Sequence, residues 1–182
     1  MYCGSNKTAI SSQRQIADAL MELMSEKPYE QITISELCKS AGISRQTFYT
    51  LFTSRENVVV YTLQEKYCYT PNEEALVRPP KGACEVRMLC RGYSEYIRKN
   101  RDFLRTLVNN HIDYLLYDSI YEALADCGCF LSKADPRKRK YAAGFYAGGI
   151  SSVARCYVAD ECAASGAELE EMLYTLFTGA LF

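Results

Sequence analysis

Between Thr33 and Phe52 a glycine turn separates two short stretches of helical periodicity, and this arrangement limits the possible folds more than any other part of the sequence. Thr33 and Glu36 have the spacing of a capping box, in which two side chains satisfy free amides at the start of a helix. Gly42, within Ala-Gly-Ile, suits a turn that requires positive φ. Ser44 is a favourable N-cap for a second helix. The stretch therefore predicts a helix-turn-helix.

The second of these helices, ISRQTFYTLF, has an apolar side and a polar side. Phe48 and Phe52 are four residues apart, so both are expected to face inward. The residues left near its N-terminus and on its outer face all form hydrogen bonds: Arg45, Gln46, Thr47, Tyr49 and Thr50. A recognition helix reads base edges with its N-terminal residues, while flanking amides and side chains hold phosphates. Spacing alone also allows a plain helical hairpin, so both interpretations stay open at this point.

The rest of the chain also favours helices, because strand-like alternation never persists beyond a few residues. Apolar residues recur at three and four residues in the expected helices 8–27, 54–67, 86–97, 101–108, 112–124, 136–160 and 165–181. Three prolines and several polar residues interrupt this pattern between Cys68 and Lys81. We therefore expect an all-α protein with two domains, residues 1–68 and residues 69–182.

Composition excludes several classes of protein. The chain has 182 residues and a net charge of −1, so overall charge indicates no particular partner. Its N-terminus lacks the apolar run of a signal peptide, and its longest uncharged stretch, Tyr141–Ala154, is shorter than the roughly 18–20 residues that span a bilayer. We expect a cytoplasmic protein without membrane contact.

Neither catalysis nor a cofactor is indicated. We find no phosphate-binding glycine loop, metal-ligand series or nucleophile–base motif, so we expect no enzyme, no metal and no cofactor. The nine cysteines are an odd number, which argues against a disulfide framework. Cys127 and Cys129 form a close pair that leaves metal or redox sensing open, although two thiolates cannot complete a tetrahedral zinc site.

The run ITISELCKSAGISRQTFYTLFTSRENVV resembles the DNA-binding domain of TetR-type bacterial transcription regulators. The resemblance lies in the hydroxyl cap, the Ala-Gly-aliphatic turn, the Tyr-x-x-Phe that ends at Phe52, and the Ser-Arg-Glu that begins at Ser54. Its Arg-Gln-Thr-Phe-Tyr form is similar to the subgroup of dihydroxyacetone kinase regulators. The resemblance implies a helix-turn-helix domain of three helices followed by a C-terminal helical bundle, with about nine helices in all.

This resemblance also implies DNA contacts. The expected set is Thr33, Ser44, Arg45, Gln46, Thr47, Tyr49, Thr50 and Arg55, with Lys7 and Arg14 as additional phosphate contacts. Residues 1–67 depart from the family pattern, because they carry seven Lys or Arg and seven Asp or Glu. Few phosphate contacts would give modest affinity and a shallow salt dependence.

Small residues fill the helix expected after Pro136, and two interpretations remain open for them. They can serve close packing within the chain, or they can let two copies approach at a dimer seam, which the resemblance favours. The expected interface consists of Gly144, Ala147, Gly148, Ser151, Ser152, Met172 and Leu176.

Fifteen tyrosines and the absence of tryptophan make an aromatic ligand pocket conceivable, although the same residues can be ordinary core. The candidate pocket residues are Tyr93, Tyr96, Phe103, Tyr114, Tyr117 and Tyr146. His111, the single histidine, and the basic run Arg137–Lys140 are expected to be surface residues.

The function that we expect is a homodimeric transcription regulator that binds an inverted-repeat operator in double-stranded DNA. Most relatives repress, so a repressor released by an unidentified small-molecule effector is the default. The alternative is a co-activator that needs a protein partner, as in a member of the dihydroxyacetone kinase regulator subgroup.

Overall fold

The structure, a computed structural model, describes residues 1–2, 4–67, 84–126 and 135–179. These ranges form nine α-helices, one short 3-10 helix and no β-strand, so the all-α prediction is confirmed. Within these ranges, no helix is both long and apolar enough to cross a bilayer. The predicted boundary after residue 68, like the Cys127/Cys129 pair, lies outside the described residues, so the division into two domains stays a prediction.

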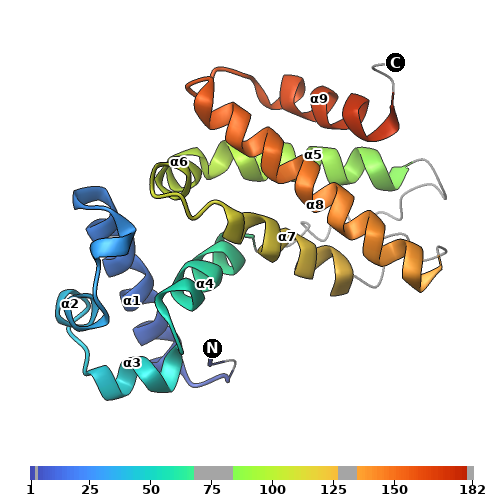
Figure 1. Cartoon of the computed structure of the whole chain (residues 1–182). Coiled ribbons are helices and arrows are strands. Elements are labelled where there is room, and N and C mark those ends of the chain that lie inside the picture. The colour runs from blue at the N-terminus through green and yellow to red at the C-terminus, as the bar shows by residue number, and fades with distance from the viewer. Residues whose placement is uncertain (3, 68–83, 127–134, 180–182) are drawn as a thin grey trace.

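Two groups of helices lie side by side in Figure 1, and we call them the head and the body. The head consists of α1 (Lys7–Glu26), η1 (Tyr29–Gln31), α2 (Ile34–Ser40), α3 (Arg45–Leu51) and α4 (Arg55–Tyr67). The body consists of α5 (Cys84–Lys99), α6 (Arg101–Asn109), α7 (Tyr114–Asp126), α8 (Pro136–Ala159) and α9 (Gly166–Thr178).

The head is built around aromatic and aliphatic side chains that helical spacing turns inward. Ile16 and Leu20 of α1 are buried, as are Phe48 at the middle of α3 and Phe52 at its C-terminus. The rings of Phe48 and Phe52 lie 6.0 Å apart, and Phe52 meets Tyr61 of α4 edge to face at 5.6 Å. Burial of each such side chain contributes about 1.5–3 kcal/mol, far more than the helix propensity of these short segments.

The body has α5 lying along α9 and α7 lying along α8 (Figure 1). Arg87 of α5 stacks on the ring of Tyr174 of α9 and forms an ion pair with Glu171 at 2.6 Å. Gly149 of α8 allows close packing, because a Cβ there would lie 2.5 Å from a ring carbon of Phe177. At this glycine, therefore, the small residue serves packing within the chain.

Head and body meet at several places, including a contact of α1 with α6. α4 packs against α7, and Asn110, at the end of α6, accepts a hydrogen bond from the backbone amide of Tyr29 at 2.7 Å. The side chain of Asn110 is itself held, since its amide group donates to the carbonyl of Thr106 at 2.9 Å. The connection between α6 and α7 therefore touches η1 of the head directly.

Side chains cap the start of several helices, as the sequence predicts for Thr33 and Ser44. Ser44, Asp135 and Ser165 each accept a hydrogen bond from a backbone amide of the helix that they precede. Thr33 does the same for α2. The carboxylate of Glu36 pairs with Lys27, and hydrogen bonds from Lys27 and from the Thr33 backbone lower its pKa. A cation at the end of α1 therefore shares the carboxylate of the predicted capping box.

The turn between α2 and α3 gives a test with an internal control. Gly42 has φ 66° and Gly92 lies inside α5, and a Cβ at either position would meet no atom within 4 Å. We expect Gly42→Ala to lower the free energy of unfolding by about 1–2 kcal/mol, because a left-handed residue with a Cβ is strained. Gly92→Ala should instead raise it by up to about 1 kcal/mol through helix propensity. Urea unfolding followed by circular dichroism measures both, and equal effects would contradict the turn geometry.

Candidate nucleic-acid interface

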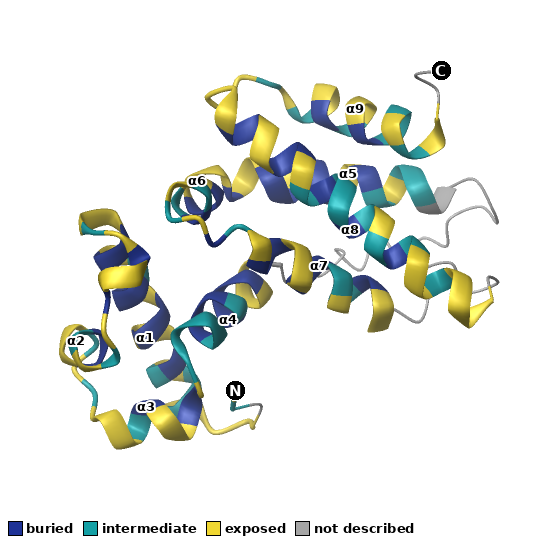
Figure 2. Ribbon diagram, viewed as in Figure 1, coloured by how far each residue is buried: buried dark blue, intermediate teal, exposed yellow. Residues whose placement is uncertain are grey.

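The outer face of α3 is polar and exposed, while its inner face is locked into the head core (Figure 2). Phe48 is 0% exposed and Leu51 is buried beside it, whereas Tyr49 between them is 50% exposed. Arg45, Gln46 and Thr50 are also exposed, and Thr47 is half-buried. The structure therefore brings these five predicted residues together on one short helix.

Local contacts hold several of these side chains in place. The ring of Tyr49 packs edge to face on Phe48, with centroids 5.5 Å apart. The Ser44 hydroxyl caps the Thr47 amide at 3.0 Å and hydrogen bonds the Thr47 hydroxyl at 2.9 Å. The Thr50 hydroxyl donates back to the carbonyl of Gln46 at 3.0 Å. Hydrogen bonds within the helix thus engage the hydroxyls of Thr47 and Thr50. No such bond engages the side-chain polar groups of Arg45, Gln46 and Tyr49.

Arg45 is the positively charged residue among the predicted DNA contacts on α3. It is exposed at the first position of α3 and makes no ion pair with a described residue. Burial raises the pKa of the neighbouring Cys38 thiol, and the charge of Arg45 partly offsets that rise. Arg45 thus lies beside the end of α2, where the two helices of the motif converge.

Arg55, predicted to contact the DNA backbone, is already occupied inside the head. One nitrogen of its guanidinium donates to the carbonyl of Tyr29 at 2.8 Å and to that of Ile32, and the group stacks over the Tyr29 ring at 4.6 Å. These contacts join α4 to η1. They do not favour the predicted phosphate contact, which remains untested.

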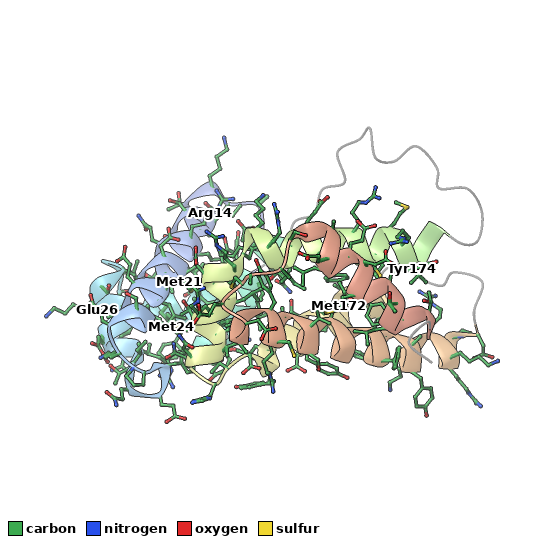
Figure 3. The ribbon with its side chains drawn as sticks, turned by 90° about the horizontal axis from the view of Figure 1, so that it is seen from above. Arg14, Met21, Met24, Glu26, Met172 and Tyr174 are labelled. Carbon is green, nitrogen blue, oxygen red and sulfur yellow. The ribbon has the colours of Figure 1, made fainter. Side chains whose placement is uncertain are left out.

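The two additional cations of α1 also differ in whether a carboxylate of the head pairs with them. Arg14, labelled in Figure 3, pairs with Glu65 of α4 at 3.1 Å, so its positive charge is compensated within the head. That pairing, with hydrogen bonds to Glu65, raises the pKa of Arg14. Lys7 is exposed at the first position of α1, and no ion pair with a described residue engages it.

An N-terminal contact escaped the sequence prediction. The amide of Tyr2 donates to the carbonyl of Leu51 at the end of α3 at 2.8 Å. Gln13, a buried polar residue of α1, fixes this segment by donating to the carbonyl of Tyr2 at 3.0 Å. The one available signal was a glutamine three residues before Ile16 on the apolar stripe of the first helix.

A family profile described as bacterial regulatory proteins, tetR family, matches residues 16–62. The match begins inside α1 and ends inside α4, so it covers the whole helix-turn-helix described above. Residues 16–62 are thus similar to the DNA-binding segment of the TetR family. The resemblance inferred from the sequence motif is confirmed.

Two curated relatives match part of the chain. The HTH-type dhaKLM operon transcriptional activator DhaS of Lactococcus lactis subsp. lactis (strain IL1403) is 32% identical over 69 residues, covering 38% of this chain and 37% of that protein. The fatty acid metabolism regulator protein of Bacillus subtilis (strain 168) is 35% identical over 52 residues, covering 29% and 27%. The matched regions thus span about a third of each relative's length, and both relatives are regulators by name.

Solved structures extend the likeness to the body. Lin0861 from Listeria innocua superposes with a TM-score of 0.80 at 16% identity, covering 99% of this chain and 96% of that one. The fatty acid degradation regulator FadR from Bacillus halodurans gives 0.59 at 19% identity, with 98% of each chain covered. The operon activator DhaS gives 0.51 at 20% identity, with 94% of each covered. At these identities the likeness establishes the fold alone.

The predicted pocket residues are spread between the core and the surface. Tyr93, Tyr96 and Phe103 are buried, Tyr146 is half-buried, and Tyr114 and Tyr117 are exposed. A hollow of about 10 Å³ between α6, α7 and α8 is lined mainly by aliphatic side chains and by none of these six residues. The hollow has the volume of about one water molecule, so the aromatic pocket stays a prediction.

The predicted dimer residues also divide into two groups. Met172 and Leu176 of α9 are exposed, as is Ser152, while Gly144, Gly148 and Ser151 are half-buried. Figure 3 shows Met172 and Tyr174 on different sides of α9, with Tyr174 toward α5. Ala147 is fully buried in the body core, so its burial does not favour its predicted place in the interface, which stays a prediction.

Arg55 and Arg45 differ in their contacts within the head, and their substitution tests how much each arginine stabilises the fold. We expect Arg55→Ala to lower the free energy of unfolding by about 2 kcal/mol, because two carbonyls lose a charged donor. Arg45→Ala should change it by less than about 0.5 kcal/mol, because that side chain is exposed and unpaired. Urea titrations of both variants by circular dichroism decide this, and a silent Arg55→Ala would mean that its contacts do not stabilise the head.

Proposed function

We propose that this chain is a homodimeric transcription regulator that inserts α3 of each copy into the major groove of DNA. The observation that carries the proposal is the division of α3 between a fully buried Phe48 and an exposed face with Arg45, Gln46 and Tyr49. Arginine and glutamine are the side chains that make paired hydrogen bonds to guanine and adenine. The operator is an inverted repeat, because a twofold dimer presents two such helices.

The surface that joins the two copies is the outer side of α8 and α9. Large apolar side chains are exposed there, with Phe145 at 63% and Tyr141, Met172 and Leu176 as its neighbours on the same two helices. Phe145 also contacts Phe177 of α9, at 6.1 Å between ring centroids. A second copy that covers this face removes apolar area from water, and it aligns two heads for two half-sites.

Regulation follows from the contact between body and head. α6 ends at Asn109, and the next residue, Asn110, holds the Tyr29 amide of η1. A change in the body that shifts α6 therefore moves the head relative to its partner. Because groove docking requires a fixed spacing of the two recognition helices, the coupling is worth the usual 1–3 kcal/mol, or about 5- to 150-fold in affinity. We take the chain to be a repressor that a small molecule releases.

A second candidate is a co-activator that binds DNA together with a protein partner. It is favoured by the name of the Lactococcus relative, which is a transcriptional activator, and by the equal numbers of basic and acidic residues in positions 1–67. Weak phosphate neutralisation would make the head depend on other contacts. The repressor should bind DNA unaided, whereas the co-activator should not.

The first test is a selection of binding sites from random DNA duplexes at low and near-physiological salt. We expect an inverted repeat to be recovered, and Arg45→Ala and Tyr49→Ala each to weaken binding to it about tenfold, equivalent to about 1.4 kcal/mol. Fluorescence anisotropy measures this, and Arg137→Ala, an exposed cation of α8, is the control. Undiminished binding by both folded variants would refute the placement of α3, and no selected sequence from a folded dimer would favour the co-activator.

The dimer surface is tested by charge insertion. We expect Phe145→Asp to convert the dimer to a monomer at micromolar concentration, because a carboxylate would be buried against apolar side chains. Tyr114→Asp is the matched control, since Tyr114 is 52% exposed but lies on α7. Sedimentation velocity gives the masses, and a dimer that survives Phe145→Asp would place the interface elsewhere.

A further inference from the structure

A large open groove lies at one end of the body, where the α5–α6 junction meets the α8–α9 turn. Its volume is about 640 Å³, within the range of about 300–1,000 Å³ typical of small-molecule sites. Lys99 and Arg101 line it from α5 and α6, and Tyr157, Cys162 and Ser165 line it from the other side. Figure 1 shows these two junctions at the same end of the body, away from α3. We call this hollow the corner groove.

Positive charge dominates the corner groove. Arg98, Lys99 and Arg101 line it against a single lining carboxylate, that of Glu95. Arg98 and Lys99 form no ion pair or hydrogen bond with a described residue, whereas Arg101 has only Asp102 at 3.9 Å. Cations gathered along a hollow focus the potential inside it. The lining of the groove therefore carries a net positive charge, which favours the binding of an anion.

Contacts in the two junctions hold the cations toward the groove. The side chain of Arg98 lies over Gly166, where a Cβ would meet its Cδ and Nε at 3.4 and 3.5 Å. Arg105 of α6 reaches across to the α8–α9 turn, where it donates to the Cys162 sulfur at 3.5 Å. Burial and then Cys162 raise the pKa of Tyr157, while Arg101, Arg98 and Arg105 act in the opposite direction. These arginines thus surround the inner wall at Tyr157.

The start of α6 adds backbone donors at the same place. Asn100 occupies the N-cap position but caps no amide, because its side chain donates to the carbonyl of Tyr96 at 2.9 Å. The first amides of a helix without a capping side chain are favourable partners for an anion. By contrast, Ser165 and Glu168 cap the start of α9 fully.

We infer that the corner groove binds a small organic anion carrying several carboxylate or phosphate groups, through Arg98, Lys99 and Arg101. Its hollow admits a metabolite-sized molecule, and two or more oxyanion groups can pair with Arg98 and Lys99, which form no ion pair with a described residue. Guanidinium groups bind both carboxylate and phosphate in paired geometry, so the two sources share this chemistry.

The position of the groove also suggests a consequence, which rests on the proposed function. α6 begins at the groove with Arg101, and Asn110 just beyond its other end holds the Tyr29 amide of the head. An anion that draws the start of α6 toward the α8–α9 turn would act on this contact through one rigid helix. The bound anion would then alter the affinity of the dimer for DNA.

Binding is tested first without DNA, by isothermal titration with citrate and with pyrophosphate at constant ionic strength. We expect saturable binding of at least one probe at one site per chain, weakened tenfold or more by Arg98→Ala with Lys99→Ala. The control, Arg137→Ala with Lys138→Ala, removes two exposed cations from α8 and should leave affinity unchanged. The tighter probe identifies carboxylate or phosphate chemistry.

Two results would overturn the site: no saturable heat with either probe, or equal affinity in the Arg98/Lys99 double variant and the original chain. If that double variant fails to fold by circular dichroism, Lys99→Ala and Arg101→Gln, both at exposed positions, decide instead.

The link to the head is tested separately, by titrating DNA with and without saturating probe. We expect the probe to change DNA affinity severalfold in the original chain and much less in Asn110→Ala, which should bind the probe equally well. Unchanged DNA affinity in the original chain would overturn the link and leave the site intact. If a folded dimer binds the anion but never binds DNA, the proposed regulator function is refuted and the proposed anion site still stands.

Discussion

Burial of Phe48 is the interaction on which the recognition surface depends. α3 spans only Arg45–Leu51, and an isolated helix of that length does not persist in water. The segment is helical because Phe48 and Leu51 insert into the core made by α1 and α4, and because Ser44 and the Tyr2 amide satisfy its two ends. The side chains of Arg45 and Gln46 take no part in this anchoring, so they are free to face a ligand.

A second constraint is the convergence of contacts on Tyr29. Arg55 stacks on its ring and binds its carbonyl, while Asn110 of the body binds its amide. The backbone of Tyr29 therefore forms hydrogen bonds with α4 through its carbonyl and with the residue after α6 through its amide. Under the proposed regulation, a shift at the end of α6 would therefore act on a residue that α4 also holds.

Sequence periodicity was sufficient for the helices and for placing the polar residues of α3 on one exposed face, because side chains four residues apart must share a helix face. It could not show contacts whose partner comes from a distant segment. Glu36 also pairs with Lys27, and Arg55 turns inward to Tyr29. The sequence likewise could not predict the corner groove, because Arg98 and Ser165 are brought together only when α5 packs on α9.

The separation of a buried face and an exposed polar face on α3 has an evolutionary consequence. Substitutions at Arg45, Gln46 or Tyr49 change the exposed face of the helix but remove little from the core, so they cost little stability. Under the proposed function, a lineage can therefore exchange one operator for another by single steps, each of which leaves a folded protein. The same scaffold can spread to many genes while its sequence diverges, as a TM-score of 0.80 at 16% identity illustrates for the Listeria protein.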